Sequence, residues 1–150
     1  MGGEGEAGKV KEGEHVREVK DKAPKALILD SSGIFHARDA HALLSLSEGG
    51  YIIMVTRQVL EEVKDYRSLA LLEVLKPNVV DVDEGDVERI MSRARDLSRA
   101  DASIVALASR LVGEGYVVRV VTDDVKLIAA IKRLRGVEVI TVNVRLGKRR

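Results

Sequence analysis

Acidic side chains recur at positions where strands are predicted to end or helices to begin. In a protein of alternating strands and helices, these positions meet at one edge of the sheet, so residues distant in sequence become neighbours. Carboxylate oxygens gathered without histidine or cysteine favour Mg²⁺ or Mn²⁺ over zinc. Such a site supports attack of a metal-activated water on a phosphodiester. The candidate metal ligands are Asp30, Glu62, Asp101, Asp123 and Asp124.

Each aspartate also has a purely structural explanation. Asp30 precedes two serines and a glycine, so it could shape a turn or cap the next helix. Asp101 stands three residues after Ser98, in a variant of the helix capping box. A single N-cap accounts for only one of Asp123 and Asp124, and the sequence does not decide which of them is the closer metal ligand.

Glu62 is separated from its neighbour Glu61 by helical geometry. In the helix that contains both, Val63, Tyr66 and Ala70 are predicted to form an apolar stripe. Glu62 lies about 60° from the origin of that stripe, whereas Glu61 points about 160° away, into water. A carboxylate beside a buried face needs a neutralising partner, which is either a metal or a lysine or arginine.

The elements that position these acids alternate between strands and helices. Glycine and proline punctuate the pattern and set its boundaries. The alternation predicts an α/β fold, a three-layer sandwich with a mainly parallel central sheet of about five strands. Strands are expected at Ala26–Leu29, Tyr51–Val55, Val79–Val82, Val117–Val121 and Val137–Val142. Helices are expected at Ala37–Leu46, Arg57–Leu75, Asp86–Leu97, Arg99–Val112 and Val125–Leu134.

Composition sets the class of protein. The chain has 150 residues, 45% of them hydrophobic, which suits one domain with its own core. We expect that domain at residues 25–143, after a flexible charged segment at 1–24 and before a basic tail at 144–150. The lack of cysteine excludes disulfides and thiol catalysis, and no apolar run reaches the length of a membrane span. A cytoplasmic location without membrane contact is therefore expected.

Four short motifs resemble those of PIN-domain ribonucleases, and most closely the archaeal NOB-type endonucleases that mature small-subunit ribosomal RNA. The similarity covers about residues 25–142. The motifs are Leu29-Asp30-Ser31-Ser32, Val59-Leu60-Glu61-Glu62-Val63, Leu97-Ser98-Arg99-Ala100-Asp101 with Ala106-Leu107-Ala108, and Val121-Thr122-Asp123-Asp124. NOB-type enzymes usually carry a zinc ribbon as well, and this sequence has no cysteine to build one.

The resemblance implies a Mg²⁺- or Mn²⁺-dependent endoribonuclease acting on single-stranded RNA. It implies that Asp30, Glu62, Asp101 and Asp124 are catalytic metal ligands, with Asp123 still open. Ser32 and Thr122 would steady the site. The absence of a Gly-x-Ser-x-Gly elbow argues against a nucleophilic serine. Implied partners are RNA, including a ribosomal RNA precursor or a ribosomal subunit precursor, and a homodimer is left open.

RNA contact is expected at the basic tail. A net charge of +1 gives no global attraction for a polyanion, so affinity must come from local clusters. Lys148, Arg149 and Arg150 form the densest one and could release counterions from phosphates. The alternative is a solvated surface without RNA contact.

Three other functions fit parts of the pattern. A VapC-type toxin ribonuclease shares the fold and the small size. A catalytically weak RNA-binding or assembly module would keep the fold without turnover. A receiver-like phosphoacceptor domain would also place acids at strand ends, but Glu62 and Asp101 lie on helices far along the chain.

Overall fold

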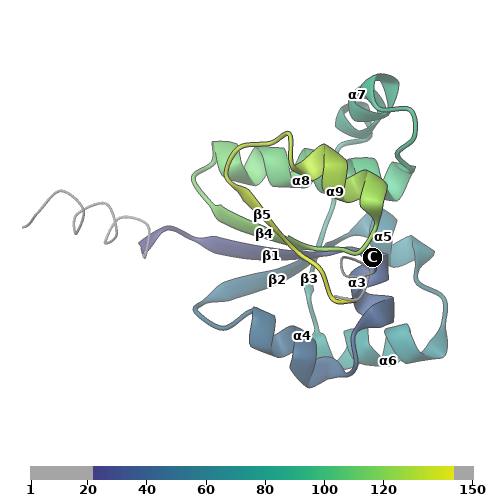
Figure 1. Ribbon diagram of the computed structural model, residues 1–150, viewed down its shortest axis with the longest axis vertical. Helices are drawn as coiled ribbons and strands as arrows, with labels where there is room; N and C mark the ends of the chain where they lie inside the picture. The colour runs from purple at the N-terminus through teal and green to yellow at the C-terminus, as the bar shows by residue number, and fades with distance from the viewer. Residues whose placement is uncertain (1–21, 144–150) are drawn as a thin grey trace, which may run out of the picture.

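The computed structural model describes residues 22–143, which form a five-stranded, all-parallel sheet between two layers of helices (Figure 1). The predicted three-layer α/β sandwich is therefore confirmed. The sheet order is β3-β2-β1-β4-β5. The strands are β1 (Lys25–Leu29), β2 (Tyr51–Thr56), β3 (Asn78–Val80), β4 (Val117–Val121) and β5 (Val137–Ile140). The expectations for residues 1–21 and for the tail at 144–150 lie outside the described residues.

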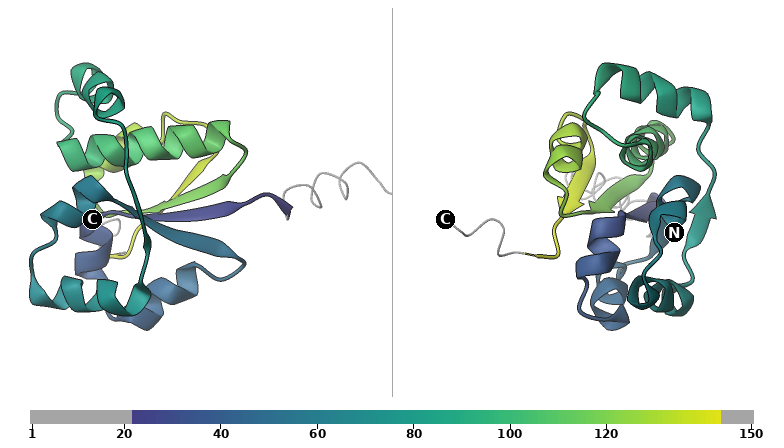
Figure 2. Two further views of the ribbon diagram at one scale, coloured as in Figure 1. Left: turned by 180° about the vertical axis from the view of Figure 1, so that it is seen from behind. Right: turned by 90° about the vertical axis from the view of Figure 1, so that its right-hand side faces the viewer.

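Helices cover both faces of the sheet. Helices α3, α4 and α6 lie on one face, and α8 and α9 lie on the other with α7 packed outside α8 (Figures 1 and 2). The helices are α3 (Ser31–His36), α4 (Ala40–Leu46), α5 (Arg57–Glu62), α6 (Tyr66–Leu75), α7 (Glu84–Arg93), α8 (Arg99–Gly113) and α9 (Val125–Ile131). No helix in this part of the chain is long and apolar enough to span a bilayer.

The central strand β1 is buried on both sides, which explains its unbroken apolar sequence. Ala26 and Ile28 belong to the hydrophobic cluster under α8 and α9, whereas Leu27 and Leu29 belong to the cluster under α3, α4 and α6. Strands that are covered on both faces need apolar side chains at successive positions rather than at alternate ones. Two separate cores therefore hold the sheet in a fixed position between its helices.

The prediction of one helix over Arg57–Leu75 is wrong, because the chain forms two helices there. Val63 leaves helical geometry with ψ of 112°, and the Asp65 side chain then caps α6 by accepting a hydrogen bond from the Ser68 amide. The new helix points its first residue outward, so Tyr66 is 91% exposed instead of lying on a buried stripe. An apolar stripe extrapolated through a helix break loses its register.

The helix predicted at Ala37–Leu46 is present as α4, although it starts at Ala40, and a separate helix before it was not predicted. Helix α3 begins directly after Asp30 and ends at His36, and a separate helix α4 starts at Ala40. The Asp39 side chain caps α4 by accepting a hydrogen bond from the Ala42 amide. Two adjacent serines and a glycine have low helix propensity, and this hid α3 in the sequence.

Gly33 allows α3 to lie against β4. A Cβ atom at Gly33 would lie 2.7 Å from the carbonyl oxygen of Val121, which belongs to a strand backbone that cannot move aside. We expect Gly33→Ala to reduce the free energy of unfolding by about 1–3 kcal/mol, the usual cost of overpacking. Gly113→Ala is the control, because Gly113 lies at the end of α8 with no atom within 4 Å of the added methyl. Chemical denaturation measures both, and equal stabilities of the two variants would contradict the packing argument.

Arg119, a charged residue within the apolar strand β4, has partners for its guanidinium group on two other strands. Its guanidinium lies 4.3 Å from the centre of the Tyr51 ring, and its Nε donates to Glu138 at 2.8 Å. Glu138 is on the neighbouring strand β5, and Tyr51 is at the start of β2, on the far side of β1. Cation–π contact with an ion pair offsets the desolvation of the charge.

Candidate active site

The order of strands in the sheet reverses between β1 and β4, which is the topological switch point of this α/β fold. Strands β2 and β3 are added on one side of β1, after which the chain returns through α7 and α8 to place β4 on the other side. The carboxyl ends of strands at such a switch point are where open α/β sheets bind their ligands. Asp30 follows β1 and the Thr122-Asp123-Asp124 segment follows β4, so both lie at this point.

Asp30 is buried and held by two hydroxyl groups. Only 2% of the surface of Asp30 is exposed. Oδ2 accepts hydrogen bonds from Ser32 Oγ at 2.8 Å and from Thr122 Oγ1 at 2.7 Å. Within residues 22–143, no donor engages the second oxygen, Oδ1. One carboxylate oxygen therefore fixes the side chain while the other remains free to bind a ligand.

The same two hydroxyls also organise the backbone after β4. Ser32 Oγ accepts from the amide of Asp123 at 2.9 Å, and Thr122 Oγ1 accepts from the amide of Asp124 at 3.0 Å. Each hydroxyl thus donates to Asp30 and accepts from the segment that carries the next acids. The ends of β1 and β4 are tied together through side chains as well as through the sheet.

Asp101 begins α8 and is desolvated by its surroundings. It forms a capping box with Ser98, in which the Ser98 hydroxyl accepts from the Asp101 amide at 3.1 Å. Burial and, after it, the negative charges of Asp30 and Asp124 raise the pKa of the Asp101 carboxyl from 3.8 to about 6. Capping therefore explains the position of Asp101 but leaves its charge unfavourable.

Glu62 is the last residue of α5, the helix that follows β2, and it lies close enough to Asp30 and Asp124 to be repelled by them. Its side chain is exposed, and Oε1 accepts a hydrogen bond of 3.3 Å from Ser31 Oγ. Partial burial raises the pKa of Glu62, and repulsion from Asp30 and Asp124 adds to this shift.

Four acids from separate segments thus act on one another electrostatically: Asp30, Glu62, Asp101 and Asp124, called the four-acid cluster below. In the described part of the chain, no lysine or arginine forms an ion pair with any of them. Carboxylates that lie close enough to repel one another without a cation nearby are stabilised by a bound metal or by shared protons.

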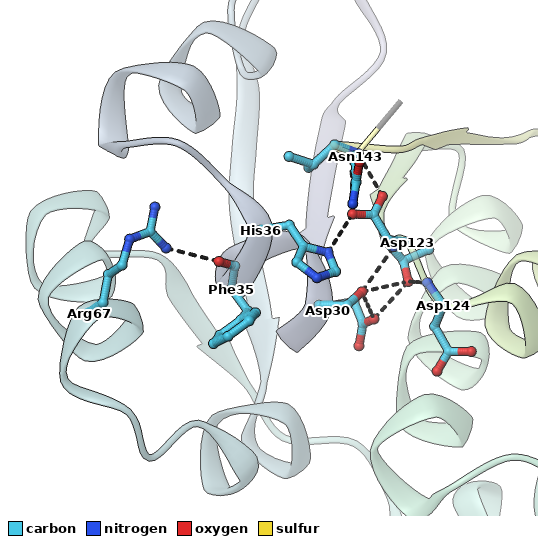
Figure 3. A network of polar contacts seen from close by, with 10 residues as sticks. Asp30, Phe35, His36, Arg67, Asp123, Asp124 and Asn143 are labelled. Atoms are coloured by element: carbon cyan, nitrogen blue, oxygen red, sulfur yellow. Dashed lines mark hydrogen bonds and ion pairs between the residues drawn. The ribbon is translucent and has the colours of Figure 1, made fainter. Parts of the chain in front are cut away.

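Asp123 is turned away from the four-acid cluster (Figure 3). Its two oxygens accept hydrogen bonds from the amides of Val142 at 2.7 Å and Asn143 at 3.0 Å, and His36 Nδ1 lies 2.7 Å from Oδ2. Both oxygens are occupied by protein donors, so Asp123 anchors the chain after β5. Of the two adjacent acids left open by the sequence, the structure brings Asp124 and not Asp123 into the cluster.

A buried polar contact connects the helices that carry Glu62 and Asp101. Thr56, at the end of β2, caps α5 through the amide of Val59 and shares a 2.8 Å hydrogen bond with Ser103 of α8. Both hydroxyl-bearing residues are fully buried. A hydroxyl pair in an apolar environment is costly to separate, so α5 and α8 are held at a fixed distance.

The donor chemistry of the four-acid cluster suits a hard divalent cation. All of its candidate donors are carboxylate oxygens, which Mg²⁺ and Mn²⁺ prefer. Among the described side chains, no group of three or more acids or histidines is arranged to hold an ion directly. Mg²⁺ retains several waters and binds through one or two carboxylates, so a hydrated ion fits this arrangement.

The metal-free protein should become more stable as the pH falls from neutral toward about pH 5. The folded-state pKa of Asp101 is about 6, against 3.8 for an unperturbed aspartate, so the folded state holds a proton that the unfolded chain has released. This contribution is complete below the unfolded pKa and is lost as the pH rises through about 6. We expect about 1–2 kcal/mol after discounting for solvent screening.

Denaturation of Asp101→Asn across the same pH range tests this prediction. Asparagine keeps a side-chain oxygen for the capping box and removes the charge. The difference in stability between wild type and variant should shrink as the pH falls. A difference that stays constant with pH would contradict the raised pKa.

Sequence reasoning missed three residues beside the cluster. His36 contacts Asp123, Phe35 lies next to it, and Arg67 donates to the backbone carbonyls of Phe35, Ala37 and Arg38 (Figure 3). The only signal was that Phe35 is the single phenylalanine of the chain, in a segment close after Asp30.

Comparison with known proteins leaves the function open. No protein-family model and no curated protein matches the chain. A similar solved structure, an uncharacterized protein from Mycobacterium paratuberculosis, shares 17% identity with a TM-score of 0.30. The match covers 67% of this chain and 47% of the other, so this chain spans about half the length of that protein. This likeness is too weak to carry a functional argument.

Proposed function

We propose that the protein is a metal-dependent endoribonuclease that hydrolyses phosphodiester bonds in single-stranded RNA. The proposal is carried by one observation: at the switch point of the sheet, Asp30 and Asp124 repel both Glu62 and Asp101, and no lysine or arginine among the described residues pairs with any of the four. A fold maintained for stability alone gains nothing from such a cluster, since unpaired buried charge is unfavourable. The resemblance of the four sequence motifs to those of PIN-domain ribonucleases supports the same chemistry.

Structural roles account for only part of the cluster. Asp101 completes the Ser98 capping box of α8 and Asp124 caps α9, and each role requires only one side-chain oxygen at a helix start. Asp30 accepts no capping hydrogen bond from α3, and Glu62 is at the end of its helix rather than at the start. Capping therefore leaves the convergence of these two acids with the others unexplained.

In the proposed reaction, Asp30, Glu62, Asp101 and Asp124 would hold Mg²⁺ or Mn²⁺. When bound, the cation would lower the pKa of the attacking water and neutralise charge on the phosphate oxygens. Ser32 and Thr122 would keep one oxygen of Asp30 occupied, which orients the other oxygen toward the ligand. The buried Thr56–Ser103 contact would keep Glu62 and Asp101 at a constant separation through the reaction.

Processing of a ribosomal RNA precursor in the cytoplasm, as in NOB-type enzymes, is part of this proposal, and so is phosphate contact by Lys148, Arg149 and Arg150. A second candidate is a catalytically weak RNA-binding module with the same fold. It is favoured by the finding that no three acids within residues 22–143 are arranged to hold an ion directly.

Incubation of the full chain with a labelled single-stranded oligoribonucleotide tests the proposal. We expect internal cleavage with Mg²⁺ or Mn²⁺ and none after addition of a chelator. The same sequence as DNA serves as the control for the sugar. RNA binding without metal-dependent cleavage would refute the enzyme and support the weak module. Cleavage that persists in chelator would indicate a contaminating or metal-independent nuclease.

A further inference from the structure

A cavity of about 330 Å³ adjoins the four-acid cluster and shares residues with it. Ser31 and Glu62 form the wall on the side of the acids, and Phe35, His36, Asp65 and Ser68 contribute to the remainder. The volume is at the lower end of the range of about 300–1,000 Å³ for small-ligand pockets. A group bound in it would lie directly beside whatever occupies the acidic site.

Phe35 presents an aromatic ring at this cavity instead of packing in the core. It is 56% exposed, although phenylalanine gains more from burial than most side chains. Its ring meets the His36 ring edge-on, with centres 5.5 Å apart and planes at 65°. The edge contact leaves a face of the Phe35 ring without a protein aromatic stacked on it among the described residues.

The two rings are held in position from behind. His36 is fixed by Asp123, which is itself anchored by the amides of Val142 and Asn143 (Figure 3). Arg67 donates to the carbonyl oxygen of Phe35 at 2.9 Å and also to those of the two residues after His36. An exposed ring on a rigid backbone loses little conformational entropy when a flat ligand stacks on it.

Ser68 contributes a buried hydroxyl behind the wall of this cavity. It is 1% exposed, and its Oγ makes no well-aligned hydrogen bond with the described residues. The backbone and the side chain of Ser68 both lower the pKa of Asp65, so the hydroxyl faces that carboxylate. Asp65 lies beside it and accepts from the Ser68 amide through Oδ2 at 2.9 Å.

Charge decides which part of a nucleotide fits this cavity. Its carboxylates, Glu62 and Asp65, repel a phosphate group, and no lysine or arginine lines it. A nucleobase is flat and uncharged, and its amino and imino hydrogens can pair with carboxylate and hydroxyl oxygens. The cavity therefore suits the base, while the phosphate that follows it lies at the four-acid cluster.

We infer that the cavity beside Phe35 binds the base of the nucleotide next to the scissile phosphate, with that base stacked on the Phe35 ring. This inference rests on the proposed function, and it gives that function its preference for single strands. A base inside a duplex is stacked on both faces and cannot reach a side-chain ring, whereas an unpaired base can turn outward.

Fluorescence of 2-aminopurine tests the inference without any need for cleavage. Single-stranded oligoribonucleotides with one 2-aminopurine, moved stepwise along the strand, are titrated with the full chain in Ca²⁺. We expect stacking to quench the fluorescence at the position seated on Phe35. Phe35→Leu, which keeps an apolar side chain, should remove the quenching and weaken binding by at least about 5-fold. Phe35→Tyr should retain both, and Val74→Ala, an exposed apolar residue on α6, is the matched control.

The outcomes separate this inference from the proposed function. Loss of quenching and affinity in Phe35→Leu, with Phe35→Tyr and Val74→Ala unchanged, would support the stacking site whether or not the RNA is cut. Equal quenching and affinity in wild type and Phe35→Leu would overturn it, even if metal-dependent cleavage is found. Absence of quenching at every position in the wild type would overturn it as well.

Discussion

Asp30→Asn should lower the rate of metal-dependent RNA cleavage by at least about 100-fold, the scale on which loss of one preorganised electrostatic group reduces turnover. Asparagine has nearly the same shape, and its side-chain oxygen can still accept from Ser32 and Thr122. What it loses is a negative charge that, like that of Asp124, repels both Glu62 and Asp101. The measurement is the initial cleavage rate at saturating metal.

The stability of Asp30→Asn distinguishes catalysis from structural support. If Asp30 only shaped the turn after β1, the variant would unfold more easily and the folded fraction would still cut RNA. We expect the reverse, a metal-free variant at least as stable as wild type, because one of four mutually repelling charges is gone. Asp83→Asn is the matched control, since Asp83 caps α7 outside the cluster and asparagine caps equally well. Full activity in Asp30→Asn would disprove the proposed site.

Mg²⁺ or Mn²⁺ should raise the stability of the folded protein at neutral pH by about 2.7 kcal/mol when the free metal is 100 times its dissociation constant. If the proposed site is correct, the metal binds the folded state, where the four-acid cluster is assembled, and finds no such site in the unfolded chain. For a domain of this size the gain corresponds to a rise of several degrees in the unfolding temperature. Thermal unfolding in chelator and in increasing MgCl₂, at constant ionic strength, measures it.

Variants identify where the stabilising metal binds. Asp30→Asn and Asp101→Asn should each lose most of the increase, whereas Asp83→Asn should keep it. Because bound metal displaces protons from Asp101, the increase should also diminish as the pH falls through about 6. An unfolding temperature that is unchanged by metal, or that rises equally in all three variants, would contradict a metal site at the four-acid cluster.

The sheet could be predicted from the sequence because its strands carry their own signals. The apolar runs of β1 and β4 have no alternation, as expected for strands covered on both faces, and glycines or prolines separate most elements. Arg119 interrupts the pattern of β4 and is accommodated by Glu138 on β5 and by the Tyr51 ring on β2, across β1. Such a contact depends on register, which no local pattern specifies.

Helix breaks were harder to predict, because they depend on tertiary packing. Val63 leaves the helix and packs in the core cluster under α3, α4 and α6. Two residues later, Asp65 caps the next helix, α6. Continuous helical geometry through this point gave Tyr66 a buried position that it does not have. The predicted helical position of Glu62 was unaffected, because Glu62 precedes the break at Val63.

The acids of the candidate site followed from topology, but their orientation did not. Knowing that β1 and β4 end at the same edge was enough to group Asp30 with the segment after Thr122. Whether Asp123 or Asp124 faces the other acids depended on the amides of Val142 and Asn143, which are supplied by the chain after β5. Phe35 is held at the cavity by Arg67 of α6, which donates to its carbonyl oxygen, and no pattern in the sequence predicts this contact.

The hydrogen bond between Thr122 and Asp30 joins residues 92 positions apart, and this separation governs when the cluster can exist during synthesis of the protein. A chain emerging from the ribosome contains Asp30 early, yet β4 must be made and paired with β1 before Asp124 approaches it. Contacts of such long range form late and together with the rest of the fold. A partly translated chain therefore lacks the assembled four-acid cluster and, with it, the activity proposed for that cluster.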